Sequence, residues 1–262
     1  MTAMRLKRYP SPSGGFALGK MGAGATMLGG WKNPYVTNGL IAMWDGEWNA
    51  GQGKHDANAA NWKDCVNGYI ATFNGNVTIG DNYIDAAEGI SAPVSVGEDV
   101  VTAIRSGAMT YETVMRPLEN LPNFATVVLR SVQDGYTHFR VDFNNTINNR
   151  FATTVMNTQK YTEVGANGWY NYIQSIYTYV TGNSFYSQIK SSYGSKTANG
   201  TFSSANHTVD RFSFGGWDGA DPLTFARPKR FWNIRFYNRV LTTAEKNANK
   251  EVDAERFGCV RW

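Results

Sequence analysis

The segment from Asp45 to Asn58 holds the residue types best suited to binding a polar ligand. One glycine-rich stretch combines carboxylates, amides, an imidazole and an indole: Asp45, Glu47, Trp48, Asn49, His55, Asp56 and Asn58. An exposed indole can stack on the apolar face of a sugar ring, while carboxylates and amides bond its hydroxyl groups. We therefore expect Trp48, Asn49, His55 and Asp56 to contact a glycan. The alternative is a structural loop whose Asp and Asn residues only form turns.

Two further ligand sites are suggested by the same residue types. Calcium prefers six or more oxygen ligands, so an ion near Asp45 and Asp56 is one expectation, although the spacing is not that of an EF-hand. Trp217 and Asp218 lie side by side in a second glycine-rich loop, at residues 215–222. This loop is either a second platform for the ligand or only the tip of a hairpin. No other cofactor is expected.

Recognisable catalytic motifs are absent from the chain. It has three histidines, no Cys/His metal spacing, and no glycine pattern of the kind that binds nucleotides. Glu251, Asp253 and Glu255 would share one face of a strand, but they fall in a segment that the pattern predicts to be helical. His138 alternates with Arg140 and Asp142, which is typical of the polar face of a strand. We therefore predict that the chain is not an enzyme.

Composition indicates a β-rich protein and excludes several classes. The chain has 262 residues, of which 42% are hydrophobic, 14% aromatic and only 18% charged. A net charge of +4 without a long basic run does not favour a nucleic-acid partner. No run of about 18 apolar residues is present that would span a membrane, and the start does not resemble a signal peptide. The sequence leaves open whether Cys65 and Cys259 pair.

Alternating segments separated by turn residues run through the chain from residue 39. The segments are 39–44, 68–73, 109–116, 124–131, 137–143, 150–156, 170–180, 184–190, 211–215 and 230–241. Asp134-Gly135 and Gly182-Asn183 are hairpin signals. A helix follows, with Thr242 or Thr243 as its cap and Gly258 at its end. We predict an all-β, two-sheet antiparallel sandwich over residues 39–262, and an extended Gly/Pro/Ser-rich arm over residues 1–38.

Both ends of residues 39–262 resemble one family. The stretch from Gly39 to Asp64, with its Trp-Asp strand end and Trp-Lys-Asp turn, resembles the opening of bacterial and phage laminin G-like domains. The strand, Asn-Arg-Val-Leu-Thr link and helix from Arg230 to Gly258 resemble their close. The resemblance implies a concanavalin A-like jelly roll, a fold of lectins that binds sugars or proteins and sometimes cuts sugars. Glu251-x-Asp253-x-Glu255 is similar to the catalytic signature of jelly-roll β-glucanases, which in that family lies on a strand.

The function expected from these features is non-catalytic recognition or adhesion through glycan binding. We expect a component of a bacteriophage virion, or of a bacterial surface assembly, located on the virion or outside the cell. The arm, with Arg5, Lys7 and Arg8, would join the domain to other subunits in an oligomer or larger particle. Two alternatives stay open. One is a purely structural decoration protein, and the other is a glycoside hydrolase or lyase with an unrecognised site.

Overall fold

A computed structural model describes six stretches of the chain. They are residues 33–48, 56–119, 123–144, 150–164, 172–216 and 228–260. Most of the predicted arm, including Arg5, Lys7 and Arg8, lies outside them, so its anchoring role stays a prediction. The last part of the arm does contact the C-terminal helix, because the Val36 backbone N–H donates to Asn249 Oδ1 at 2.9 Å.

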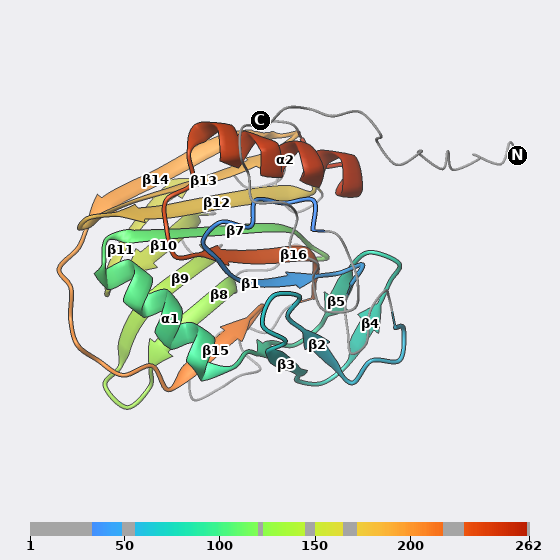
Figure 1. Cartoon of the computed structure of the whole chain (residues 1–262), viewed down its shortest axis with the longest axis horizontal. Helices are drawn as coiled ribbons and strands as arrows, with labels where there is room; N and C mark the ends of the chain where they lie inside the picture. The colour runs from blue at the N-terminus through green and yellow to red at the C-terminus, as the bar shows by residue number, and fades with distance from the viewer. Residues whose placement is uncertain are drawn as a thin grey trace, which may run out of the picture.

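Two antiparallel sheets face each other and form a sandwich (Figure 1). The first sheet has the order β14–β13–β12–β7–β16–β5–β4, and β1 also pairs with β16. Its strands are β1 Leu40–Asp45, β4 Val77–Ile79, β5 Ile84–Ala86, β7 Ala108–Pro117, β12 Gln174–Thr181, β13 Ser184–Ser191, β14 Gly194–Thr201 and β16 Lys229–Tyr237. The predicted two-sheet antiparallel sandwich is confirmed.

The second sheet has the order β11–β10–β9–β8–β15–β6–β3–β2. Its strands are β2 Asn61–Lys63, β3 Ile70–Phe73, β6 Ile90–Ser91, β8 Asn123–Ser131, β9 Tyr136–Asn144, β10 Arg150–Val155, β11 Thr158–Glu163 and β15 Arg211–Phe214. Aromatic side chains fill the space between the sheets. Trp44 meets Phe214 edge-to-face at 4.9 Å between ring centroids, and Tyr111 meets Phe139 at 5.5 Å. Such edge-to-face pairs stabilise a core beyond the area that they bury.

Both predicted hairpin turns are present. Asp134-Gly135 connects β8 to β9, and Gly182-Asn183 connects β12 to β13. The two glycines have positive φ angles, 64° at Gly135 and 56° at Gly182, which residues with a Cβ adopt only at a cost. The residue types that favour hairpin turns therefore predicted both connections correctly.

A helix that the sequence did not reveal, α1 Val94–Arg105, lies between β6 and β7. Its buried side chains include Val96, Val100 and Ile104, which recur at helical spacing. The segment is rich in β-branched valine and contains Gly97, both of which lower helix propensity. Gly97 allows close packing, because a side-chain carbon there would lie 3.2 Å from Val209 Cγ1. Tertiary packing thus overrides a weak local preference.

The last strand, β16, contains an irregularity that changes which side chains face the core. Strict alternation predicts that Phe231 shares a face with Asn233 and Arg235. In the pairing with β7 the register shifts between Phe231 and Asn233. Phe231 joins the main core, whereas Trp232 packs against Phe257 on the other side of the sheet. The extra residue of a bulge reverses the alternation at this point.

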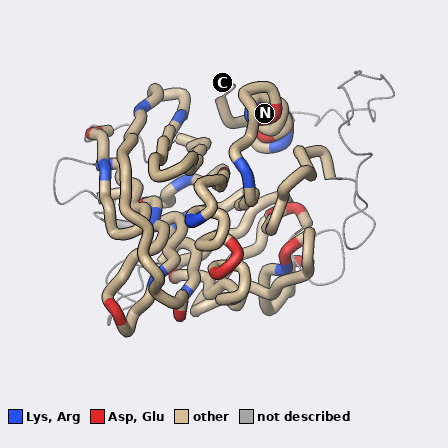
Figure 2. Tube along the Cα trace, turned by 60° about the vertical axis from the view of Figure 1, so that its left-hand side comes forward, with Lys and Arg blue, Asp and Glu red and all other residues tan. Residues whose placement is uncertain are grey.

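The predicted C-terminal helix is confirmed as α2 Thr243–Phe257, and it lies over the outer face of the first sheet (Figure 1). Thr242 caps it, with Glu245 completing a capping box, and Gly258 ends it in the left-handed conformation. α2 carries charges of both signs (Figure 2). It has a strongly polar composition, so its attachment depends on buried ion pairs more than on apolar contacts. No helix in the described stretches is long and apolar enough to cross a membrane.

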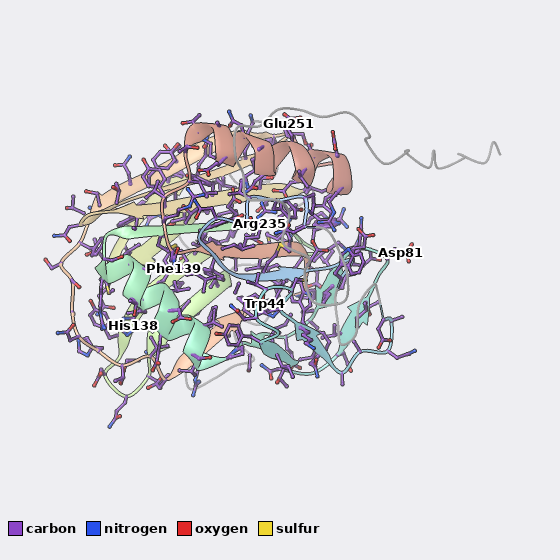
Figure 3. The ribbon with its side chains drawn as sticks, in the orientation of Figure 1. Trp44, Asp81, His138, Phe139, Arg235 and Glu251 are labelled. Carbon is purple, nitrogen blue, oxygen red and sulfur yellow. The ribbon has the colours of Figure 1, made fainter. Side chains whose placement is uncertain are left out.

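Those buried ion pairs centre on Arg235, which lies beneath α2 while Glu251 lies on the opposite side of the helix (Figure 3). Arg235 donates to both carboxylate oxygens of Asp253 at 2.7 Å, and its Nε donates to Glu112 at 3.1 Å. Lys250 Nζ lies 3.5 Å from Glu112. Two cations and two anions therefore balance in a site that water does not reach. Burial alone would raise the pKa of Asp253, but the Arg235 charge and hydrogen bonds lower it to about 2.

Candidate functional site

The predicted glycan loop is described only in part. Asn49, His55, Trp217 and Asp218 lie outside the described residues. Trp48 is half-buried and packs against a small cluster that contains Tyr35, Met43 and Cys65. Asp56 is exposed, and its Oδ1 accepts a hydrogen bond from the Asn58 backbone at 2.9 Å. Among the predicted ligand residues, the two that are described have structural contacts, and the glycan role of this loop stays a prediction.

Asp45 ends β1 completely buried, and its carboxylate is already paired. Arg256 of α2 donates to its two oxygens at 2.6 and 2.8 Å, and Arg256 also contacts Glu47 at 3.1 Å. The Asp45 Oδ1 accepts from the Glu47 backbone as well. The Asp45 carboxylate is thus already paired with a cation of the protein, and a calcium ion near Asp45 and Asp56 stays a prediction. Within the described stretches, no cluster of three or more His, Cys, Asp or Glu side chains could hold a metal.

The two cysteines are separate buried thiols in the structure. Burial raises the pKa of the Cys65 thiol well above its ordinary value, and burial also raises that of Cys259. The thiolate is the reactive form of cysteine, so neither side chain is suited to nucleophilic chemistry.

The Glu251-x-Asp253-x-Glu255 triplet lies in α2 and not on a strand. Glu251 and Glu255 are exposed on the helix surface, whereas Asp253 is buried against Arg235. The strand geometry that would place all three carboxylates on one face is therefore absent. The triplet therefore lacks the strand arrangement of the glucanase signature, as its predicted place in a helix implied.

The structure brings together an acid–base cluster that the sequence analysis missed. Asp134 lies in the turn after β8, Tyr136 begins β9, and His207 lies in the connection from β14 to β15. Asp134 Oδ2 and His207 Nδ1 are 2.9 Å apart, with 42% and 36% of their side chains exposed. The His207 ring stacks on Tyr136 at 4.2 Å between centroids. His138 lies on the inner side of this cluster, 6.5 Å from the His207 ring.

Three side chains around His207 have pKa values that depart from their ordinary values. The hydrogen bond from His207 lowers the pKa of Asp134, so Asp134 is a carboxylate at neutral pH. Burial raises the pKa of Tyr136, which keeps its phenol protonated. Burial lowers the pKa of His138 to about 4, so this ring is neutral. An Asp-oriented histidine open to solvent is an arrangement that can transfer protons to and from a bound molecule.

Arg105, at the end of α1, holds the His207 segment in place. Its guanidinium donates to the carbonyl oxygens of Ala205 at 2.9 Å and of His207 at 2.9 Å. Asp134 is further fixed by Ser131, whose hydroxyl donates to Asp134 Oδ2 at 2.9 Å. Asp134 and His207 are 73 residues apart in the chain, and no local motif could have joined them.

Comparison with known proteins finds structural likeness alone. No family model matches the chain, and no curated protein matches it by sequence. The sandwich is similar to the Trypanosoma rangeli sialidase in complex with sialic acid, with a TM-score of 0.57 and 13% identity over 84% of this chain and 33% of the sialidase. It is similar to the same sialidase with the inhibitor DANA, at 0.57 and 12% over 81% and 32%.

A toxin domain shows the same likeness. The binding domain of botulinum neurotoxin DC in complex with SialylT matches with a TM-score of 0.52 and 10% identity, over 80% of this chain and 50% of the toxin domain. At identities this low, the structural match shows a shared fold alone. This chain spans about a third of the length of the sialidases and about half of the toxin domain.

These comparisons correct the predicted activity. The sequence was interpreted as a non-catalytic recognition or adhesion module and as a chain that is not an enzyme. The solved structures that match include several sialidases, which are glycoside hydrolases. That finding contradicts the non-catalytic prediction and favours the alternative of a glycoside hydrolase. The sequence-based reasoning failed because it searched for a local catalytic motif. The predicted location on a virion or cell surface is untested.

Proposed function

We propose that this chain acts in glycan hydrolysis, as a glycoside hydrolase for sugars that contain sialic acid. The observation that supports this most is the match of the sandwich to sialidase structures over 79% or more of the chain. The chain covers about a third of those sialidases, so their activity is carried over here as part of the proposal. We further propose that the sandwich belongs to the concanavalin A-like superfamily, as both ends of the sequence suggest.

Hydrolysis of a glycosidic bond needs a proton for the leaving oxygen and a group that accepts one from water. In the described part of the chain, Asp134 and His207 offer both functions at a surface open to solvent, with the buried Tyr136 ring stacked against His207. Asp134 holds the His207 Nδ1 atom, which leaves the other ring nitrogen to exchange a proton with the sugar. The protonated Tyr136 phenol supplies a hydrogen-bond donor beside it. We assign proton transfer to His207 and its orientation to Asp134.

The test is sialic acid release by the purified chain from an aryl sialoside and from sialyllactose. We expect release by the natural chain and a loss of about 100-fold or more in His207→Gln, the range typical of a general acid or base. Asp134→Asn should also lower the rate and shift its pH profile. Glu98→Gln is the matched control, since Glu98 is an exposed acid on α1. No release from any substrate, or full activity in His207→Gln, would overturn the proposal.

A further inference from the structure

The buried ion cluster beneath α2 holds an amine and a carboxyl group in contact. Lys250 Nζ lies 3.5 Å from Glu112 Oε1, and the two side chains are 1% and 0% exposed. A hydrogen bond between an ammonium and a carboxylate is usually about 2.7–2.9 Å long, so this contact is loose for an ion pair. Glu112 Oε1 accepts no hydrogen bond from any described residue. The amine and the carboxyl group thus touch without a hydrogen bond to hold them as ions.

The other oxygen of Glu112 is bound by two donors. Arg235 Nε donates to Oε2 at 3.1 Å, and Asn249 Nδ2 donates to the same atom at 2.7 Å. Asn249 is itself fixed, because its Oδ1 accepts from the Val36 backbone N–H at 2.9 Å. Two donors on one carboxyl oxygen stabilise the negative charge that develops there when a nucleophile adds to the carboxyl carbon. Glu112 is therefore oriented with Oε2 bound and Oε1 next to Lys250.

A second carboxylate lies beside the same amine. Asp253 Oδ2 is 3.6 Å from Lys250 Nζ, and Arg235 donates to both oxygens of Asp253 at 2.7 Å. A carboxylate in this position can take a proton from the amine and pass it on. Lys246, one turn earlier on α2, is a further cation of this region, and its Nζ lies 5.1 Å from the centre of the Tyr177 ring.

We propose that Glu112 and Lys250 become joined by an isopeptide bond, which fastens α2 to β7. The lone pair of Lys250 Nζ forms a bond to the carboxyl carbon of Glu112, and the bond from that carbon to Oε1 breaks. Oε1 leaves as water, and its two protons come from the Lys250 ammonium, one directly and one through Asp253. Nothing is oxidised or reduced, and no other reactant is needed. The product is an amide whose oxygen is Oε2, still bound by Arg235 and Asn249.

Burial makes this condensation more favourable than it is in water. The four side chains around Lys250 are completely buried, which leaves little water to reverse the reaction; they are Glu112, Arg235, Asn249 and Asp253. Reactive groups held in good orientation have effective concentrations on the order of 10⁵ M or more. The reaction also removes one buried cation and one buried anion, whose hydration is lost in the folded chain. Arg235 and Asp253 remain as a balanced pair.

The test is intact mass spectrometry of the purified full chain under denaturing conditions. We expect most of the natural chain to have a mass lower by one water molecule. Lys250→Arg keeps the positive charge without the primary amine and should have its full mass. Lys246→Arg is the matched control, a conservative change of another lysine on the same helix, and it should still lose water. Full mass of the natural chain after several days in the folded state would overturn the proposal.

Peptide mapping of the natural chain locates the lost water, and it decides the question even if Lys250→Arg folds poorly. Trypsin should release one joined species in which the peptide with Glu112 is attached to the peptide with Lys250. Water lost at an Asp-Gly sequence, such as Asp134-Gly135, would leave these two peptides separate and would overturn the proposal. A loss of water that persists in Lys250→Arg would do the same.

A chain kept unfolded in urea provides the second control. It should retain its full mass, because only the fold brings Glu112 and Lys250 together. The natural chain should also run ahead of Lys250→Arg in a denaturing gel, since a closed loop from β7 to α2 keeps the unfolded chain more compact. Equal migration of the two chains would contradict the cross-link.

Discussion

Replacing Lys229 by methionine should make this protein more stable, although the change removes a charged residue from a strand. Lys229 begins β16 and is 1% exposed. Its stem packs against Gly215 of the opposite sheet, where a side-chain carbon would come within 2.8 Å of Lys229 Cδ. Its Nζ atom has no hydrogen-bond partner within the described residues. A buried, unpaired ammonium group is costly because nothing replaces the water that it loses.

The size of this cost follows from the pKa. Burial lowers the pKa of Lys229 from 10.5 to about 7. Each unit of difference between the two pKa values corresponds to about 1.4 kcal/mol. Charging Lys229 in the folded state therefore costs on the order of 5 kcal/mol. The unfolded chain binds the proton up to pH 10.5, whereas the folded chain releases it near pH 7. The penalty is therefore complete below pH 7, and it disappears as the pH rises toward 10.5.

Urea unfolding between pH 6 and pH 10 measures this effect. At pH 6 we expect Lys229→Met to raise the free energy of unfolding by about 4 kcal/mol, since methionine fills a similar volume without the charge. The gain should shrink steadily toward pH 10. Lys196→Met is the control, because Lys196 is exposed and its replacement should change little. A Lys229→Met variant that is less stable than the natural chain at pH 6 would refute the reasoning.

Two further changes test the buried charges elsewhere. In urea unfolding, Asp253→Asn should lower the free energy of unfolding by about 3–5 kcal/mol, because it leaves Arg235 buried without its bidentate partner. The control is Glu251→Gln, which changes an exposed neighbour and should have little effect. His138 should make stability fall as the pH drops from about 6.5 toward 4, since the unfolded chain takes up a proton there and the folded chain does not. His138→Gln should flatten that part of the curve of melting temperature against pH, and an unchanged slope would contradict the assignment.

Most of the long strands could be predicted from the sequence because their side chains alternate, but β11 Thr158–Glu163 and β14 Gly194–Thr201 were missed. Alternation located β7, β9 and β13 to within a residue or two, and the glycines at 135 and 182 marked the turns between strands. Short strands such as β4 and β6 were missed, since two or three residues are too few to show a period. The helix α1 was missed because its valines favour a strand locally, and only packing against the sheets makes it helical.

The candidate sites could not be predicted in the same way, because they depend on contacts between distant segments. Asp134 meets His207 only after β9 to β14 have folded, and Lys250 meets Glu112 only after α2 has packed on the first sheet. These contacts are therefore properties of the folded sandwich and not of local motifs.

The Glu-x-Asp-x-Glu triplet shows the same dependence on context. On a strand, alternate residues would share a face and act together. On α2, residues 251 and 255 point to solvent, while residue 253 turns toward the sheet and neutralises Arg235. The period of a strand would make the triplet a catalytic group. The period of a helix instead makes its central residue part of an internal ion pair that holds the helix to the sheet. The capping box at Thr242, readable from the sequence, favours the helix, because Thr242 and Glu245 satisfy backbone groups of its first turn.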